Sequence, residues 1–200
     1  MDISPWLIDY GTLLNEGENS DNHSLPDFLA EELPYLWFAA YKSASSHEAN
    51  VNRFWHNTFE YIFDDCSTSE IEARLVAVVG KSNPVKKLRA KDDNRLKGWI
   101  GPTQKTFGHE WDKGHFIAHS IGGAIDGVEV NVFPQKRAIN RGRSSEGVLF
   151  RQMEIFCGQN PGTFCFNRPL YRDESARPAY FEFGVLKPDN TLWVHLFDNR

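Results

Sequence analysis

The sequence has few cysteines, no long apolar run and no basic residue near its start. Three cysteines in 200 residues are too few, and odd in number, for a disulfide scaffold, which favours a reducing compartment. No stretch approaches the roughly 18 apolar residues that a membrane-spanning helix needs, so we expect no membrane partner. The first 30 residues carry six acidic side chains and no Lys or Arg, unlike a secretory signal. We therefore expect a cytoplasmic protein, or one exported by a route that needs no signal peptide.

What the chain does contain is enough apolar and aromatic material for a packed core. Hydrophobic residues make up 40% of it, and there are 15 Phe, 6 Trp and 6 Tyr. This composition excludes a disordered protein. The length fits one domain with a helical appendage and leaves little room for two full domains.

Charge is distributed unevenly, so the formal net charge of −5 is misleading. Residues 1–73 hold 14 acidic and 2 basic side chains, a net charge of −12, whereas residues 74–154 hold 15 basic and 8 acidic ones, a net charge of +7. The asymmetry indicates a basic working surface beside an acidic segment. The basic side chains form either a solvated face or contacts to a polyphosphate such as a nucleic acid.

The order of helical and extended patterns predicts an α+β fold with an antiparallel sheet. We expect an acidic, helical N-terminal segment over residues 1–73 and a second domain over residues 74–200. Within the first segment, residues 1–25 are expected to form a loop or a loosely held arm. Helices are expected over residues 25–43, kinked or restarted at Pro34, and over residues 47–65, where aromatic residues recur every three or four positions.

The second part of the chain reads as strands around a broken helix. Alternation and β-branched residues predict strands, and a Lys-Pro-Asp-Asn turn predicts a hairpin near the end. The helix begins near Ala138 and is broken by Gly142 and Gly147. The expected strands are residues 75–79, 128–133, 163–166, 180–186 and 191–196.

Three features of the basic part belong together. These are Asp112-Lys113-Gly114-His115, a segment from Asn131 through Pro134-Gln135 to Asn140-Arg141-Gly142, and Glu154. A neutral imidazole with a pKa of about 6.5 can take a proton from water. An Asn carbonyl is a hard, neutral oxygen that suits Mg²⁺, which keeps most of its waters and needs few protein ligands. The combination indicates phosphodiester hydrolysis.

These motifs resemble those of the DNA/RNA non-specific endonucleases, a family of the His-Me finger (ββα-metal) nucleases. The resemblance covers residues 74–200 and implies a Mg²⁺-dependent endonuclease acting on DNA and RNA, with Mn²⁺ as an alternative metal. It implies that His115 is the general base, that Asn140 binds the metal and that Glu154 holds metal-bound water. It further implies that Asn131 polarises the base or touches the metal's water shell, and that Lys113 and Arg141 contribute basic side chains to the site.

The motifs also depart from the family pattern. Lys113 replaces an arginine, so a point charge stands in place of a bidentate guanidinium. Glu154 lies 14 residues beyond Asn140, which is farther than the family's spacing, and Glu146 is therefore a rival. The residue that takes the role of the family's further phosphate-binding arginine remains open. The candidates are Arg89, Arg95 and Arg151.

The same residues allow other functions. A zinc site at His109, His115 and His119 is disfavoured because the intervening sequence lacks the Glu of a zinc-peptidase helix. The runner-up is a catalytically weak nucleic-acid-binding or protein-interaction module on the same fold. A non-specific nuclease endangers its own cell, which favours a toxin or defence effector. The acidic segment could then pack on the nuclease, shield its basic groove, or bind an inhibitor, immunity or carrier protein.

Overall fold

The computed structural model describes residues 2–21, 23–84, 105, 107–124 and 129–200. An antiparallel sheet with helices packed on it confirms the predicted α+β class. The strands are β1 (Val51–His56), β2 (Phe59–Asp64), β3 (Arg74–Lys81), β4 (Trp111–His115), β5 (Val132–Lys136), β6 (Phe164–Leu170), β7 (Tyr180–Leu186) and β8 (Leu192–Asp198). The helices are α1 (Tyr10–Glu18), α2 (Leu25–Ala44), α4 (Arg137–Asn140) and α5 (Ser145–Gln159), with 3₁₀ turns η1 (Ser4–Trp6), η2 (His119–Ile121) and η3 (Glu129–Asn131).

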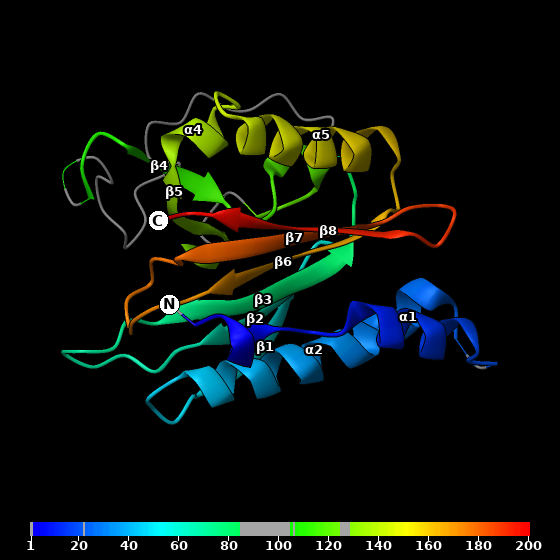
Figure 1. Cartoon of the computed structure of the whole chain (residues 1–200), viewed down its shortest axis with the longest axis horizontal. Helices are drawn as coiled ribbons and strands as arrows, with labels where there is room; N and C mark the ends of the chain where they lie inside the picture. Colours follow the sequence, from blue (N-terminus) through cyan, green and yellow to red (C-terminus); the bar gives the residue numbers. More distant parts are fainter. Residues whose placement is uncertain (1, 22, 85–104, 106, 125–128) are drawn as a thin grey trace.

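Six of the strands form one antiparallel sheet in the order β1-β2-β3-β6-β7-β8. Strands β4 and β5 pair separately, also antiparallel. Figure 1 shows α1 and α2 covering one face of the large sheet, and α5 lying over the other face beside the β4–β5 pair. The molecule therefore has a helical layer on each side of its sheet.

The layer between α5 and the sheet is aromatic. Gly147, Phe150, Met153 and Cys157 recur every three or four residues along α5 and are buried. The Phe150 ring packs edge-on against Phe181, Phe183 and Phe197, with ring centroids 5.3 to 5.5 Å apart. Such contacts fix where α5 lies on the sheet.

On the opposite face, α2 buries a second aromatic layer. Trp37 lies 4.8 Å from the Phe166 ring of β6 and is 1% exposed. The predicted helix over residues 25–43 is confirmed, and it continues through Pro34 without an interruption. Pro34 is itself buried, so packing on the sheet offsets the hydrogen bond that proline cannot donate.

The helix predicted over residues 47–65 is wrong. The segment forms β1 and β2, a hairpin in which His56 pairs with Phe59 around the turn. Asn57 takes a left-handed backbone conformation (φ 53°), which asparagine tolerates better than most residues and which suits a tight turn. The spacing of the aromatic side chains is helical, but their strand propensity is high, and β2 buries side chains on both of its faces.

The loop or loosely held arm predicted for residues 1–25 is also wrong over most of its length. Trp6 in η1 and Leu13 in α1 are 3% and 5% exposed. The Asp9 side chain accepts a hydrogen bond from the Thr12 backbone N–H at 3.1 Å and caps α1. Burial of these two side chains holds the start of the chain against the sheet.

The division expected between residues 73 and 74 falls inside the large sheet. Strand β2, from the acidic segment, pairs along its length with β3. The acidic helices α1 and α2 lie on the sheet face opposite β4, α4 and α5 (Figure 1). Of the acidic segment, β1 and β2 are therefore part of the sheet itself, and α1 and α2 pack on the face away from β4 and α4.

The predicted C-terminal strands are confirmed. Strands β6, β7 and β8 pair in sequence, and the Lys187 N–H bonds to the Thr191 carbonyl across the last turn. Residues 75–79 lie within β3, as predicted. The extended segment predicted over residues 128–133 begins outside the described residues; of its described part, Val132 and Phe133 belong to β5, whereas Glu129–Asn131 form η3. Among the described residues, no helix is long and apolar enough to span a membrane.

Candidate functional site

The two motifs singled out in the sequence lie on the paired strands β4 and β5. Asp112 is opposite Gln135, Gly114 is opposite Phe133, and His115 is opposite Val132. A Cβ atom on Gly114 would lie 2.1 Å from Gln135 Oε1 and 2.5 Å from Gln135 Cβ. Glycine is therefore required here, because the buried Gln135 side chain lies across β4 at this point.

Helix α4 follows β5 directly and faces Asp112. Arg141 donates two hydrogen bonds to this carboxylate, from Nε to Oδ2 at 2.6 Å and from Nη2 to Oδ1 at 3.0 Å. Arg137 Nε donates to Oδ1 at 3.2 Å. Asn140 Nδ2 lies 3.4 Å from Oδ2. One carboxylate thus gathers two guanidinium groups and one amide from consecutive turns of the chain.

The electrostatics of Asp112 follow from these contacts. Burial by itself would raise the pKa of the carboxyl group, but hydrogen bonds from Arg141, Asn140 and Arg137 outweigh it and hold the pKa below its ordinary value. Asp112 is therefore ionised at neutral pH. Because Asn140 turns its amide nitrogen toward this anion, its carbonyl oxygen is the atom left to accept a donor or to bind a cation.

His115 and Lys113 lie on the same strand as Asp112. His115 is the last residue of β4, three positions beyond Asp112, and three residues of strand span about 10 Å. Both side chains are partly buried. The structure therefore brings His115, Lys113 and Asn140 into one strand–strand–helix unit. That His115 and Asn140 meet at one cation stays a prediction.

Asn131 has a different environment from the one expected. It is 0% exposed, and among the described residues the hydrogen bonds of its amide all go to backbone atoms. Its Oδ1 accepts from Ile117 N–H at 2.9 Å, and its Nδ2 donates to the carbonyls of Ile117 and Ala124 at 2.8 and 2.9 Å. These bonds tie the segment that follows His115 to the start of β5.

Helix α5 presents one face to the region between α4 and η2. A Cβ atom on Gly147 would lie 2.5 Å from the Ala138 carbonyl oxygen, so α5 contacts α4 there. A turn later, Arg151 Nε lies 3.3 Å from where a Cβ atom of Gly142 would be, and near the end of α5 Gly158 faces Ile121 of η2. Gly142 has a φ of 63°, and the helix break predicted at this residue is confirmed, whereas the break predicted at Gly147 is wrong, because Gly147 lies within α5.

Glu154 lies on this face of α5, three residues after Arg151 and four before Gly158. It is partly buried. Burial raises the pKa of its carboxyl group to about 7, and the positive charge of Arg151 offsets only part of that effect. A shielded carboxyl group of this kind is a candidate ligand for a cation.

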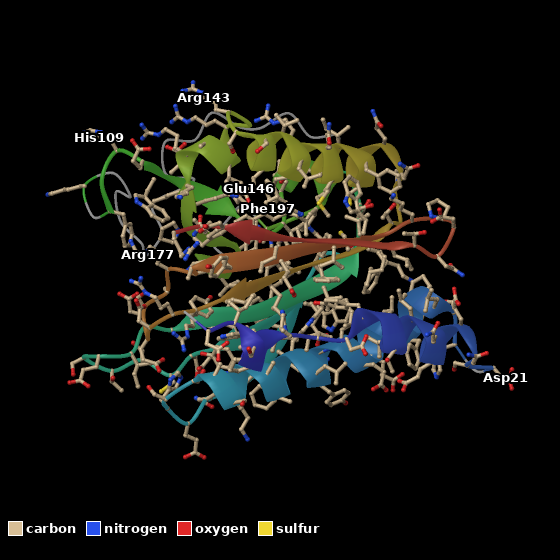
Figure 2. The ribbon with its side chains drawn as sticks, in the orientation of Figure 1. Asp21, His109, Arg143, Glu146, Arg177 and Phe197 are labelled. Atoms are coloured by element: carbon tan, nitrogen blue, oxygen red, sulfur yellow. The ribbon has the colours of Figure 1, made fainter. Side chains whose placement is uncertain are left out.

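The rival, Glu146, points elsewhere. Its Oε1 accepts a hydrogen bond from the Asp198 N–H at 3.4 Å and lies 3.9 Å from His195 Nε2. Figure 2 shows Glu146 next to Phe197 of β8. Glu146 is therefore engaged with the C-terminal strand, and Glu154 is the glutamate on the face toward α4.

Sequence reasoning missed two parts of this site. It gave Asp112 no role and did not include Arg137, although the carboxylate of Asp112 is the centre to which α4 is bound. The contact of Arg137 with Asp112 depends on the position of α4 beside β4, which the sequence pattern does not give. Arg89 and Arg95, proposed as phosphate ligands, lie outside the described residues.

The donor set limits the kind of metal that fits. Over the described parts of the chain, no three His, Cys, Asp or Glu side chains are grouped so that they could hold a metal ion. A hydrated Mg²⁺ or Mn²⁺ needs only one or two protein oxygens. The amide oxygen of Asn140 and the shielded carboxyl group of Glu154 fit such an ion by their chemistry.

Comparison with known proteins adds little to this geometry. No family model and no curated protein matches the chain. Among solved structures, it is similar to one titled "Structure of Sda1 nuclease with bound zinc ion" (18% identity over 46% of this chain and 39% of that chain, TM-score 0.38). It is also similar to one titled "extracellular endonuclease" (13% identity, 78% and 80%, TM-score 0.39). The chain thus spans about two fifths of the first. A likeness at these scores does not identify a function.

Proposed function

We propose that this chain is a metal-dependent endonuclease that hydrolyses phosphodiester bonds of DNA and RNA with little sequence preference. The observation that carries the proposal is the Asp112 carboxylate, which holds Asn140 by its amide nitrogen beside two arginines, on the strand that ends in His115. This arrangement leaves a hard oxygen donor, positive charge and an imidazole on one strand–strand–helix unit, as in a ββα-metal nuclease.

The proposed reaction is an in-line attack of water on phosphorus. His115 accepts the proton of the water, which requires its imidazole to be neutral at working pH. The backbone that follows His115 is braced by Asn131, and we assign Asn131 this positioning role. Without the brace, the loop that begins after His115 would lose three buried hydrogen bonds.

Asn140 and Glu154 would hold a hydrated Mg²⁺, with Mn²⁺ as an alternative. The bound ion supplies positive charge that stabilises the transition state and the departing 3′ oxygen. Asp112 keeps the carbonyl oxygen of Asn140 available by binding its amide nitrogen. Glu154 lies on the face of α5 toward α4. Burial disfavours the ionised form of its carboxyl group, and a nearby cation would stabilise that form.

The basic side chains would bind the substrate by its phosphates. Lys113 lies on β4, Arg137 begins α4, and Arg141 directly follows this helix. The single negative charge of Asp112 only partly neutralises the two guanidinium groups. Contacts to phosphate position a nucleic acid but carry no sequence information. We therefore expect cleavage of both DNA and RNA at many sites.

A toxin or defence role fits this activity, with a partner at the acidic segment. The α1–α2 layer lies on the face of the sheet opposite the site (Figure 1). A protein bound there would leave the site uncovered, so a carrier or delivery partner fits this layer better than an inhibitor that blocks the site.

The test is degradation of plasmid DNA and of RNA by the purified chain with Mg²⁺, compared with EDTA. His115→Ala should lose on the order of 10²–10⁴-fold in rate while remaining folded. His109→Ala, which alters an exposed histidine in the turn before β4, is the matched control and should keep full activity. Binding without cleavage by the wild type in either metal would instead support the catalytically weak binding module.

A further inference from the structure

A small pocket lined by arginines lies beside the beginning of β4. It has a volume of about 100 Å³, on the order of three water molecules in the liquid and enough for one phosphate group. Arg172, Arg177 and Arg200 line it, from the loop after β6 and from the end of the chain. We infer that it is a subsite for a backbone phosphate of a nucleic-acid strand, away from the bond that is cleaved. This assignment rests on the proposed function for the identity of the substrate.

Arg177 is presented to the pocket in a fixed orientation. Its guanidinium carbon lies 5.1 Å from the centroid of the Trp111 ring and 5.8 Å from that of Phe107. Within the described residues, its side chain makes no hydrogen bond or ion pair. A guanidinium group supported on aromatic rings keeps its N–H groups free for an anion, and phosphate matches their geometry.

The other two arginines are already paired. Arg200 donates to Asp198 from Nε at 2.9 Å and from Nη2 at 2.6 Å. Arg172 lies 4.0 Å from Asp173, which also lines the pocket. Arg177 also lies in the field of Asp173, but no carboxylate is within ion-pair distance of its guanidinium among the described residues, so an arriving phosphate would bind there first.

The backbone around Arg177 is tied to the site strands. Asn199 is 0% exposed and donates from Nδ2 to the carbonyls of Pro178 at 2.8 Å and Pro134 at 3.0 Å. Its Oδ1 accepts from the Lys136 N–H at 2.8 Å. The loop that carries Arg177 is thus bonded to β5, and the pocket is held at a fixed distance from the catalytic unit.

The pocket continues the basic surface of the site. Trp111, beside whose ring the Arg177 guanidinium lies, shares a face of β4 with Lys113 and His115, because alternate residues of a strand point the same way. Figure 2 shows Arg177 at the same end of the molecule as His109, which lies just before β4. From Trp111 to His115 the strand spans about 13 Å. A duplex strand advances about 3.4 Å per phosphate, so the subsite would hold a phosphate roughly four nucleotides from the cleaved bond.

The experiment measures binding of a 12-nucleotide single-stranded DNA to the full chain in EDTA, by fluorescence anisotropy at several salt concentrations. Arg177→Gln should weaken binding roughly threefold to tenfold and should reduce the slope of log K against log salt by about 0.7, the value for one phosphate contact. Arg177→Lys keeps the charge but not the planar group, so its affinity for the oligonucleotide should lie between those of Arg177→Gln and the wild type. Lys42→Gln removes one charge from α2 on the opposite face and should change neither quantity.

Equal binding by Arg177→Gln and the wild type would overturn the subsite, and so would an equal loss in Lys42→Gln. Thermal unfolding of each variant checks that it is folded, and Arg177→Lys serves if Arg177→Gln is not. Inorganic phosphate at matched ionic strength is a second probe. If inorganic phosphate binds at Arg177 while substitution of Arg177 leaves the affinity for the oligonucleotide unchanged, the pocket is a site for a free anion and the proposal is wrong. Because the assay needs no cleavage, the absence of nuclease activity would leave its result standing.

Discussion

The amide nitrogen of Asn140 lies 3.4 Å from Oδ2 of Asp112, and this contact decides which end of the Asn140 side chain is available. An asparagine can present either its oxygen or its nitrogen, and the carboxylate selects the nitrogen for itself. Two arginines of the same short helix share this carboxylate. The position of α4 against β4 therefore depends on one partly buried carboxylate and its partners.

Asp112→Asn should impair both metal use and stability. The neutral amide no longer selects the orientation of Asn140 and no longer balances two arginines, so the Mg²⁺ concentration for half-maximal rate should rise. The free energy of unfolding should fall by about 1 kcal/mol, because the partly buried Arg137 loses its counter-charge. A Mg²⁺ titration of the cleavage rate and urea unfolding measure the two effects. Asp189→Asn, in the β7–β8 turn, is the control. An unchanged Mg²⁺ requirement would exclude the positioning role.

Gly114→Ala should destabilise the β4–β5 pair. Its Cβ atom would overlap Gln135, which is fully buried and cannot move without displacing its neighbours. We expect a loss of about 1–3 kcal/mol in urea unfolding. Gly158→Ala in α5 is the matched control, since its Cβ atom would meet Ile121 at an ordinary 3.7 Å and alanine favours the helix. Equal stability of the two variants would show that Gln135 does not lie across Gly114.

Asn131→Ala distinguishes a brace from a metal ligand. The substitution leaves the Ile117 N–H and the carbonyls of Ile117 and Ala124 without their partner, which should cost about 3 kcal/mol or more. The fraction that stays folded at low temperature should keep the wild-type Mg²⁺ requirement. Normal stability with a raised Mg²⁺ requirement would place Asn131 at the cation, as the family resemblance implies.

Glu154 should make the stability of the metal-free protein depend on pH. Its pKa is about 7 in the folded chain, above the ordinary value of 4.5, so the folded state binds the proton more tightly than the unfolded state. Stability should therefore fall as the pH rises from about 4.5 to 7, by at most about 3 kcal/mol from this group. In EDTA, the free energy of unfolding of Glu154→Gln minus that of the wild type should be larger at pH 8 than at pH 4.5. Urea unfolding at both pH values measures this, and a pH-independent difference would contradict it.

The parts of the fold that could be predicted from sequence are those in which one period dominates. Strand β3 is a β-branched run, and β7 and β8 alternate around a proline-containing turn, so all three strands could be recognised from the sequence. The β1–β2 hairpin was missed because aromatic residues three and four apart match the helical period, and only Asn57, with its left-handed backbone, marks the turn. Helix α1 was missed because a polar, glycine-containing segment becomes helical only when Leu13 is buried.

The candidate site was predictable where residues adjacent in sequence carry the chemistry. His115 and Asn140 were recognised from their motifs, and the structure places both on one strand–strand–helix unit. The environment of Asn131 depends on how residues 117–124 fold back, which no local pattern encodes. Arg177 lies in a loop between β6 and β7 and becomes relevant only because that loop packs on Trp111.

The convergence of His115 and Asn140 is the central claim. Strand alternation alone points His115 and Asp112 to opposite faces of β4, and the claim therefore requires that the end of the strand turn the imidazole toward α4. Paramagnetic broadening of the histidine ring signals by Mn²⁺ in an NMR spectrum tests this directly, with the His115 signals assigned from their loss in His115→Ala. We expect substoichiometric Mn²⁺ to broaden His115 in the wild type, to leave His23 sharp, and to lose its effect in Asn140→Ala. His115 signals that stay sharp while Mn²⁺ binds the protein would contradict the claim.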